Sequence, residues 1–446
     1  MRLNRVLGLG FGVAFAFGTM VGVGILRLPG MVAAAAATPG RILACWVLGG
    51  LYALMGAVSM SELAVMYPEA GGLRVYVRRA LGEGVGFVVG WSDWLACVAT
   101  LAYASVSVVD FLGLLWPALA APPLPTALAL AVLAAFTLLH WGGLKMGSTV
   151  TTLASSLTAV LLLVLVAACF FGGTRVVAGP ATAAPAGAAP AAALSLLVLM
   201  PALRAIVTAY DGWYAPIYTA EESRDAARTL PRAIIGGAAL VMALYLAINA
   251  ALLHVLPVPV LAASRLPVAD AAQLVLPRGS AALLTTLSLV IVLGLINGNA
   301  LMAPRVLFGL ARDGWIPAGI AGVSPRGTPR AALLVSMVLS AVMILSGSFN
   351  QLIALFALLI VLGYVAVFTS VFVLRLREPA APRPYRAFGY PFSTFIVLLG
   401  SVAFLVAAVL EDPHSGALAL LFMSLCLPAY LLAARARRAR RAAATA

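Results

Sequence analysis

The chain has 446 residues, of which 63% are hydrophobic and only 9% are charged, and its mean hydropathy is +1.09. A soluble globular protein could not keep such a surface dispersed in water, so most of this chain must lie in lipid. The formal net charge of +14 would also suit a nucleic-acid-binding protein, but the basic residues stand in short stretches between apolar segments. That arrangement indicates membrane topology, and no nucleic-acid partner is expected.

A helix that crosses the hydrocarbon of a bilayer needs about 20 apolar residues. By this measure the chain divides into twelve apolar segments, and the sequence predicts an all-α membrane protein with twelve transmembrane helices. Their predicted ranges are 7–36, 40–66, 84–117, 123–141, 149–172, 191–221, 232–256, 280–311, 330–347, 350–375, 391–410 and 416–434. An even number of spans places both termini on one side of the membrane.

Most arginines fall on one side of this predicted topology, in the loops around 74–79, 224–232, 326–330 and 375–386 and in the tail 435–446. The positive-inside rule makes that side cytoplasmic. We therefore predict a multi-pass protein of the cell inner (plasma) membrane with cytoplasmic N- and C-termini. Its basic cytoplasmic tail is expected to contact the anionic lipid of the bilayer.

Two connections on the opposite, external side are longer than the others. Residues 173–190, rich in Ala, Pro and Gly, are expected to form a linker without a packed core;. Residues 256–279 are long enough for a short external helical hairpin.

The first apolar segment is interrupted near its middle by Gly18-Thr19-Met20-Val21-Gly22-Val23-Gly24, and Pro29 follows. Irregular backbone at mid-membrane is tolerated only where protein or a wet cavity satisfies its polar groups, so this interruption predicts a binding site. The amides of Gly22-Val23-Gly24, where the helix restarts, suit a carboxylate, and Thr19 is a further candidate substrate-binding residue. Close packing of helices through small residues is the alternative interpretation of the glycines.

A second interruption lies in the segment 191–221, at Tyr210-Asp211-Gly212-Trp213-Tyr214-Ala215-Pro216. Interrupted spans at corresponding positions of two halves are typical of secondary transporters built from an inverted repeat, with the site at the interface of the repeats. Carbonyls freed before the second interruption could accept hydrogen bonds from an ammonium group, so the two interruptions together would hold a zwitterion. The candidate substrate-binding residues here are Thr208, Tyr210, Asp211, Gly212 and Trp213, of which Trp213 is equally suited to be an aromatic gate.

Arg27, Arg204 and Asp211 are charged residues inside predicted spans. Each such residue costs roughly 2.5 to 3.5 kcal/mol on insertion scales, so charges at these depths tend to be paired and functional. A pair between Asp211 and either arginine would neutralise the site and could act as a gate. A static buried ion pair is the alternative.

Glu62, Asp93 and Asp110 lie nearer the predicted helix ends, where snorkelling or interfacial water accounts for a carboxylate;. Glu62 is kept as a candidate for gating or coupling beside Arg27, Arg204 and Asp211. We expect Asp211→Asn to impair transport more than Asp93→Asn.

No catalytic or metal-binding pattern competes with this interpretation. The chain has no H-E-x-x-H, no G-x-S-x-G and no Walker motif;. The histidines lie near predicted helix ends: His140, His254 and His414. The cysteines lie within apolar segments and are expected to be small buried hydrophobes: Cys45, Cys97, Cys169 and Cys426;. We expect no enzyme activity, no cofactor and no metal.

Five motifs occur in an order similar to that of the amino acid permeases. Gly18-Thr19-Met20-Val21-Gly22-Val23-Gly24-Ile25 is similar to G-T-x-[IV]-G-x-G-I of the first helix, and Ala209-Tyr210-Asp211-Gly212-Trp213 to A-Y-[GD]-G-W of the sixth. The other three are Ser61-Glu62-Leu63 with Tyr67-Pro68-Glu69-Ala70-Gly71-Gly72, Glu221-Glu222 with Leu230-Pro231-Arg232, and Asn297-Gly298 with Pro304-Arg305 and Ala311-Arg312-Asp313-Gly314. Nearly end to end, the chain resembles a member of the amino acid-polyamine-organocation (APC) superfamily, closest to the L-type amino acid transporter branch.

The resemblance implies a leucine-transporter-like fold with a 5+5 inverted repeat. Residues 1–172 would form the first repeat (helices 1–5), 191–376 the second (helices 6–10) and 391–434 helices 11 and 12, followed by the basic tail 435–446. Helices 1 and 6 would be broken at the substrate site. Asn297, on the eighth helix, would face the transport path.

The chain departs from the pattern of the resembling family in three ways. Several relatives carry a lysine in the fifth helix, where the stretch Gly147–Thr158 of this chain ends in Thr158, so coupling through that lysine is in doubt. Arg27 stands where the L-type branch usually has a small or apolar residue. Animal L-type proteins pair with a single-span glycoprotein through an external cysteine, and because no external cysteine is predicted here, no heavy-chain partner is expected.

The sequence therefore predicts a secondary active transporter that moves an amino acid by alternating access, as an antiporter or a symporter, so that a counter-substrate or a proton is a further partner. Two other classes compete with it. Asp211 favours a polyamine or other organic-cation carrier, whereas the amides of the first interruption favour a carboxylate. A non-transporting sensor that binds amino acids is the other class.

Overall fold

The structure, a computed structural model, describes residues 3–172, 196–276, 278–347, 349–411 and 413–445. Over these ranges every regular element is a helix, as predicted, and one isolated bridge pairs Leu7 with Ser223. The expected linker at 173–190 lies outside the described residues.

The first half of the chain contributes seven α-helices and two short 3₁₀ helices, η1 and η2. In order they are α1 (Leu9–Met20), η1 (Val23–Leu26), α2 (Leu28–Ala36), α3 (Pro39–Met66), α4 (Arg74–Leu81), α5 (Glu83–Leu115), η2 (Pro117–Ala120), α6 (Leu124–Trp141) and α7 (Leu144–Phe171). The remaining elements are α8 (Leu196–Ala209), η3 (Ala215–Glu222), α9 (Ala226–Val255), α10 (Val258–Ala263), α11 (Pro267–Val275), α12 (Ser280–Arg312), η4 (Ala318–Ala321), α13 (Arg330–Ser346), α14 (Phe349–Arg377), α15 (Phe392–Glu411) and α16 (Pro413–Thr445).

Nine helices of the described chain are long and apolar enough to cross a membrane: α3, α5, α6, α7, α9, α12, α14, α15 and α16. They coincide with nine of the twelve predicted segments. The first and sixth predicted segments are interrupted, into α1, η1 and α2 and into α8 and η3, and the ninth, α13, has only 17 residues. The structure thus supports an all-helical protein with several spans, and interruptions are the main reason why fewer than twelve are continuous.

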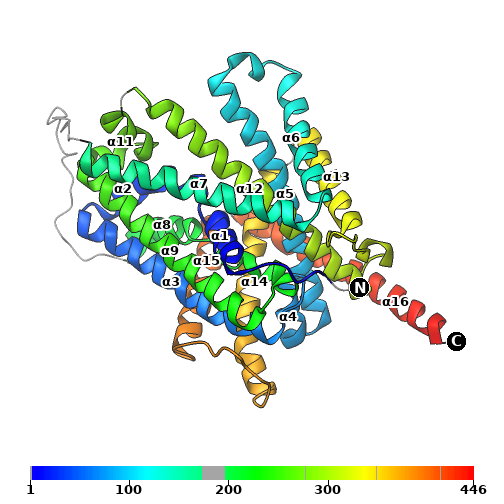
Figure 1. Cartoon of the computed structure of the whole chain (residues 1–446). Coiled ribbons are helices and arrows are strands. Elements are labelled where there is room, and N and C mark those ends of the chain that lie inside the picture. Colours follow the sequence, from blue (N-terminus) through cyan, green and yellow to red (C-terminus); the bar gives the residue numbers. More distant parts are fainter. Residues whose placement is uncertain (1–2, 173–195, 277, 348, 412, 446) are drawn as a thin grey trace.

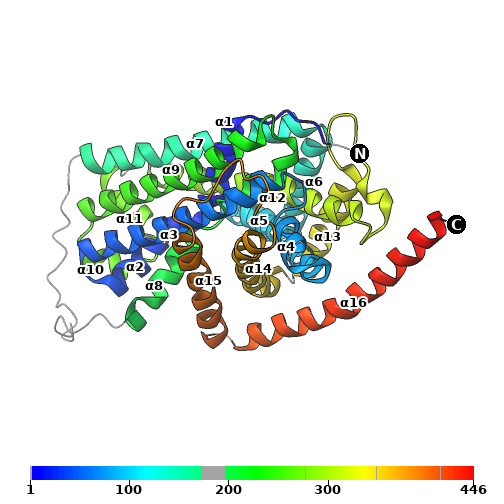
Figure 2. The ribbon, with the colours of Figure 1, turned by 90° about the horizontal axis from the view of Figure 1, so that it is seen from below.

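The helices of the two halves of the chain interleave. α7, α9 and α12 pack against α1, which lies among them in the view of Figure 1, and Met20 and Val21 at its end are buried. α3 packs along α9, and α5 packs along α12. α16 extends away from the body, with the C-terminus at its far end in both views (Figures 1 and 2). The interruption after α1 therefore lies inside the bundle rather than on its surface.

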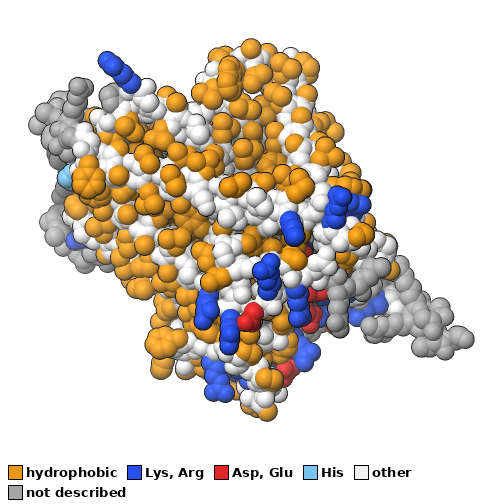
Figure 3. All heavy atoms as spheres, in the orientation of Figure 1, with side chains coloured by type: hydrophobic (Ala, Val, Ile, Leu, Met, Phe, Trp, Pro, Cys, Tyr) orange, Lys and Arg blue, Asp and Glu red, His pale blue; other side chains and the backbone are white. Residues whose placement is uncertain are grey.

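The surface is divided by composition. Hydrophobic side chains cover most of the visible face, and lysine and arginine gather near the N-terminus and α4 (Figure 3). Arg74, Arg78 and Arg79 belong to α4, and we name this end of the molecule the arginine-rich side. One basic end beside a broad apolar surface is the distribution expected of a membrane protein with one basic side.

A short helical pair covers the opposite end of the first interrupted helix. α10 and α11 lie within the region 256–279, where a helical hairpin was predicted. α2 packs against α10, and a Cβ placed on Gly30 would lie only 2.6 Å from the carbonyl oxygen of Ser264. Glycine at position 30 thus permits the close approach of this pair.

Candidate functional site

The first interruption separates α1 from η1 and α2. α1 ends at Met20, and Val21 and Gly22 are extended before helical turns resume. The amide of Gly22 donates to the Met20 carbonyl at 3.0 Å, whereas the amides of Val23 and Gly24 have no acceptor among the described residues. These two N–H groups belong to the stretch that is predicted to face a carboxylate, but of this interruption only Thr19 lines either of the two cavities described below.

The second interruption touches the first. Gly212 has a φ of +104°, a region that residues with a side chain rarely adopt;. A Cβ at this position would lie 2.6 Å from the Thr19 carbonyl oxygen and 3.1 Å from the Met20 amide nitrogen. The Thr19 hydroxyl lies 2.8 Å from the carbonyl oxygen of Gly212, to which it can donate. The two interrupted stretches are therefore in direct contact, and only glycine fits at position 212.

A buried tyrosine of α9 joins the ends of the two half-helices. The Tyr245 hydroxyl lies 3.1 Å from the Met20 carbonyl oxygen and 3.2 Å from that of Ala209, the last residues of α1 and α8. Helix C-termini carry a partial negative charge, so two of them side by side repel unless a donor lies between them. The Tyr245 hydroxyl is such a donor, and its ring packs edge-on against Trp46 at 5.6 Å between centroids.

A cavity of about 120 Å³, the central cavity, lies beside this contact, between the second interruption, α5 and α12. Its lining contains two carboxylates and no basic side chain, so its electrostatic character is negative. Its polar lining residues include Thr19, Asp93, Thr100, Asp211, Tyr218 and Asn299. A small polar molecule with a positive group matches this lining.

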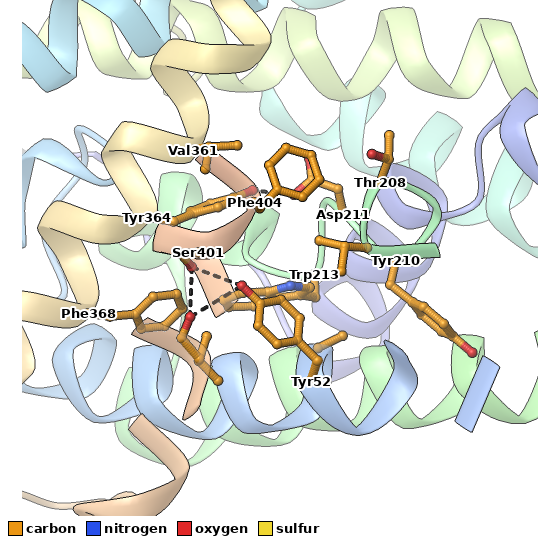
Figure 4. A pocket seen from close by; sticks show the side chains of 13 residues that line it. Tyr52, Thr208, Tyr210, Asp211, Trp213, Val361, Tyr364, Phe368, Ser401 and Phe404 are labelled. Carbon is orange, nitrogen blue, oxygen red and sulfur yellow. Dashed lines mark hydrogen bonds between the residues drawn. The ribbon is translucent and has the colours of Figure 1, made fainter. Parts of the chain in front are cut away.

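A smaller cavity of about 50 Å³, the side cavity, lies across the interruption, between α3, α14 and α15. Figure 4 shows Tyr52 and Ser401 joined at its edge, with their oxygens 2.9 Å apart, and Trp213 extending across it. The Tyr210 ring points away from the other side chains in this view. Aromatic and aliphatic side chains make up most of its walls, so the side cavity is suited to an apolar group rather than to an ion.

Asp211 lines both cavities and forms part of the wall between them. Its Oδ1 accepts a hydrogen bond from the hydroxyl of Tyr364 on α14 (Figure 4). Neither predicted ion pair of Asp211 is formed within the described ranges: Arg27 is exposed at the end of η1, and the Arg204 guanidinium lies over the Phe404 ring at 5.6 Å. A neutral hydroxyl therefore holds this carboxylate where an arginine was expected.

The sequence profile of the amino acid permeases matches residues 12–426. The chain belongs to the amino acid permease family. The permease is 27% identical over 438 residues to the serine/threonine exchanger SteT of Bacillus subtilis, and the match covers 96% of each chain. It is 31% identical over 345 residues to an uncharacterized transporter of Mycobacterium bovis, covering 76% of this chain and 74% of that one. It is 25% identical over 417 residues to the mouse b(0,+)-type amino acid transporter 1, and the match covers 92% of this chain and 84% of the mouse protein.

These similarities confirm the resemblance inferred from the five motifs. The permease is an amino acid transporter of the membrane and not an enzyme.

Asn297, which the family resemblance places toward the transport path, lines neither of the two cavities. It is fully buried, and its Nδ2 donates to the Gly147 carbonyl at 3.0 Å and to the Thr151 hydroxyl at 2.7 Å. Its Oδ1 lies 3.0 Å from Nε2 of His140. These contacts join α12 to α6 and α7 and occupy the amide. Asn299, two residues further along α12, lines the central cavity instead.

Asp93 is buried inside the protein, whereas snorkelling or interfacial water was expected to account for it. α5 runs from Glu83 to Leu115, so Asp93 lies ten residues after its start. Asp93 is 7% exposed and lines the central cavity. Its Oδ1 accepts a hydrogen bond of 2.7 Å from the Tyr218 hydroxyl. Snorkelling therefore does not account for this carboxylate.

Glu62 is also buried, at 1% exposure, and it lines neither cavity. Its Oε1 lies 2.9 Å from Nε of Arg375 and 3.2 Å from Nε of Arg383, and its Oε2 accepts from the Ala387 amide at 2.7 Å. These contacts hold the connection between α14 and α15 against α3. The geometry thus gives Glu62 a structural place away from both cavities.

Three further candidates lie around the side cavity. Thr208 is exposed, and its hydroxyl donates to the Arg204 carbonyl at 3.0 Å. Tyr210 lines the side cavity, and its hydroxyl donates to the Trp46 carbonyl at 3.2 Å. Trp213 is 5% exposed and lines the side cavity. All three candidates therefore line the side cavity.

α7 is tied to α1 without a lysine. The Ser155 hydroxyl donates to the Ala14 carbonyl at 2.7 Å. A Cβ on Gly18 would lie 2.3 Å from the hydroxyl oxygen of Ser155. Thr158, which stands at the position of the family's lysine, is buried on α7 one turn further along. Ser155 was not identified from the sequence, because a serine in a small-residue helix carries no distinguishing pattern.

Proposed function

We propose that the permease carries an amino acid through the central cavity by alternating access, and that main-chain groups of the two interruptions hold the substrate's own main-chain groups. The contact of Gly212 with Thr19 is the observation that carries this proposal, because it brings both interruptions to one side of a polar cavity. The amides of Val23 and Gly24 suit the carboxylate, and helix dipoles add to that attraction. The carboxylates in the lining of the central cavity suit the ammonium group.

The proposed architecture is a leucine-transporter-like fold of twelve spans in two inverted repeats. In support, each proposed repeat, 1–172 and 191–376, begins with an interrupted helix. α15 and α16 follow and correspond to the two additional spans at 391–434. The arginine-rich side would face the cytoplasm by the positive-inside rule, with both termini on that side of the cell inner membrane.

Exchange is the transport mode we favour over proton symport. The relative SteT, similar over 96% of each chain, is named a serine/threonine exchanger. Thr158 in place of a lysine leaves the fifth helix without the charged side chain that several relatives carry there. A counter-substrate amino acid is accordingly the proposed partner of each transport cycle.

The experiment is uptake of labelled amino acids into proteoliposomes, with vesicles either empty or preloaded with unlabelled amino acids. Exchange predicts uptake that requires preloading and does not rise at acid pH. Gly24→Leu should abolish this uptake, because its side chain would fill the space beside the free amides. Gly40→Leu is the matched control, since a Cβ on Gly40 meets nothing within 4 Å. Unchanged uptake by well-expressed Gly24→Leu protein would contradict the proposed site.

One observation favours a second candidate, an organic-cation carrier. Asp93 and Asp211 both line the central cavity, and no basic residue does. Competition between a free amino acid and its methyl ester separates the two candidates. An ester that competes as well as the free acid would favour the cation carrier, whereas loss of competition supports recognition of a carboxylate.

A further inference from the structure

The Asp93–Tyr218 hydrogen bond joins α5 to η3 at one end of the central cavity. Both residues line that cavity, and the bond length is 2.7 Å. Asp93 lies ten residues from the α5 terminus that adjoins α4, or about 15 Å along the helix axis;. Tyr218 lies four residues before Glu222, the last residue of η3. The bond therefore lies between the central cavity and the arginine-rich side.

The loop between α3 and α4 packs directly against this bond. Gly72 has a φ of +68°, and a Cβ there would lie 2.4 Å from Cε1 of Tyr218 and 2.8 Å from Oδ2 of Asp93. Two residues earlier, the Ala70 amide donates to Glu221 at 3.0 Å, and Arg312 binds the same carboxylate at 2.6 Å. No solute can pass between Gly72 and Tyr218 while these contacts persist.

Asp93 is held by few partners for a buried carboxylate. Its Oδ2 has no hydrogen-bond partner in the part of the chain that the structure describes, and the atom is inaccessible to solvent. A buried carboxylate with one partner is poorly compensated. Water that entered from the arginine-rich side would supply the missing partners, so an open state with hydrated Asp93 is not strongly disfavoured.

We infer that Asp93 and Tyr218 close the central cavity toward the arginine-rich side, and that separation of this pair opens the cavity on that side. This inference rests on the proposed function, in which the central cavity holds the substrate. Asp93 and Tyr218 are positioning residues here, since they act through the placement of η3 and the α3–α4 loop. The pair accounts for a buried carboxylate and a buried tyrosine that substrate recognition at the interruptions does not require.

Cys97 provides a reporter for this closure. It lines the central cavity one turn after Asp93, and it is only 5% exposed. The other three cysteines are also free and buried, and they can be replaced: Cys45, Cys169 and Cys426. In that background, a membrane-impermeant methanethiosulfonate reagent modifies Cys97 only when water reaches the cavity.

The experiment compares labelling rates in inside-out and right-side-out membrane vesicles. Tyr218→Phe should raise the rate at Cys97 about tenfold in inside-out vesicles, the effect of losing one hydrogen bond to a carboxylate, and leave the rate unchanged in right-side-out vesicles. Asp93→Asn keeps an acceptor for the tyrosine and should give a smaller increase. Tyr76→Phe is the matched control, because its buried hydroxyl has no partner within the described residues. Its rate should equal that of the parent protein.

Equal labelling rates in Tyr218→Phe and the parent protein, both monodisperse on gel filtration, would overturn the inference, and so would an equal increase from both sides. The proposed function is tested separately from the closure, by protection of Cys97 from labelling in the presence of substrate. L-serine and L-threonine at saturating concentration should slow labelling of Cys97 in the parent protein. Absence of this protection together with no amino acid uptake would contradict the proposed substrate site, whereas the sidedness of Tyr218→Phe labelling tests the closure alone.

Discussion

The hydroxyl oxygen of Thr19 lies 2.8 Å from the carbonyl oxygen of Gly212, although 193 positions separate these residues in the sequence. Main chain meets main chain at this point, so the interruption after α1 cannot shift far without moving the one after α8. Tyr245 joins the same two stretches from the opposite side, through the carbonyls of Met20 and Ala209. Two hydroxyl groups therefore fix the relative placement of the interruptions.

Gly212→Ala should disrupt this contact. The added Cβ would lie 2.6 Å from the Thr19 carbonyl oxygen, and the φ of +104° disfavours any side chain. We expect a loss of roughly 1 to 3 kcal/mol in the free energy of unfolding and near-complete loss of uptake. Thermal unfolding in detergent and proteoliposome uptake measure the two effects.

Gly236→Ala is the control for that substitution, because Gly236 is exposed on α9 and a Cβ there meets nothing within 4 Å. It should leave uptake unchanged and stabilise the helix by up to about 1 kcal/mol. Equal behaviour of the two alanine variants would refute the proposed contact between the interruptions.

The helices themselves could be predicted from the sequence because length and hydropathy alone fix most of them. The interruptions were predicted as well, since Gly18 to Gly24 and Gly212 break apolar segments. Contacts between helices were not. Tyr245 and Tyr364 are single tyrosines in apolar helices, and helices that are apolar all round have no periodic face that reveals which neighbour a given side chain meets.

The two asparagines of α12 illustrate this limit. Two residues along a helix correspond to a rotation of about 200° about its axis, so the side chains point to nearly opposite sides. Asn297 and Asn299 therefore face different neighbours. Motif similarity pointed to this turn of α12, but it did not show that Asn299 and not Asn297 lines the central cavity. The burial of Asp93 was missed for a similar reason: the predicted range 84–117 agrees with α5, but hydropathy does not show which residues of an apolar helix face the interior of the protein.

Asn299→Ala and Asn297→Ala should therefore fail in different ways. Asn299 lines the central cavity, so its removal should raise the KM for exchange several-fold with little change in thermal stability. Asn297→Ala leaves Nε2 of His140 without its partner and removes the bonds to Thr151 and the Gly147 carbonyl, at a cost of roughly 1 to 3 kcal/mol in unfolding free energy;. The KM of the folded fraction should remain that of the parent. A raised KM in Asn297→Ala with an unchanged KM in Asn299→Ala would show that Asn297 and not Asn299 faces the transport path.

Asp211→Asn and Tyr364→Phe should each impair transport, because the hydrogen bond between these residues forms the wall between the two cavities. Tyr364→Phe removes this hydrogen bond, and Asp211→Asn weakens it by replacing a charged acceptor with a neutral one, so the double variant should be no worse than the more impaired single one;. Asp110→Asn is the control on exposed surface of α5 and should transport normally. Additive losses in the double variant would show that Asp211 and Tyr364 act separately. Asp93 no longer serves as the unaffected comparison, because it lines the central cavity.

The Glu222–Arg305 pair should be the most costly ion pair to break. Both side chains are buried, at 0% and 4% exposure, and two bonds of 2.6 and 2.8 Å join them. Removing one partner leaves an uncompensated buried charge, so Glu222→Gln should lower the free energy of unfolding by roughly 3 to 5 kcal/mol. The Glu222 carbonyl also accepts from the amides of Val6 and Leu7, at 2.9 and 3.0 Å, so the N-terminal segment depends on the same residue.

Arg228→Gln is the surface comparison for this pair. Arg228 lies 3.9 Å from Asp225, with both side chains more than half exposed, and such pairs contribute about 0 to 1 kcal/mol;. If the loss of stability on substituting Glu222 comes from the unpaired charge of Arg305, the double variant Glu222→Leu and Arg305→Leu should be less destabilised than either single variant. Thermal unfolding of the four proteins of that cycle measures this coupling. A double variant as unstable as the sum of its single variants would mean that packing around Glu222 and Arg305, and not their charges, stabilises this part of the protein.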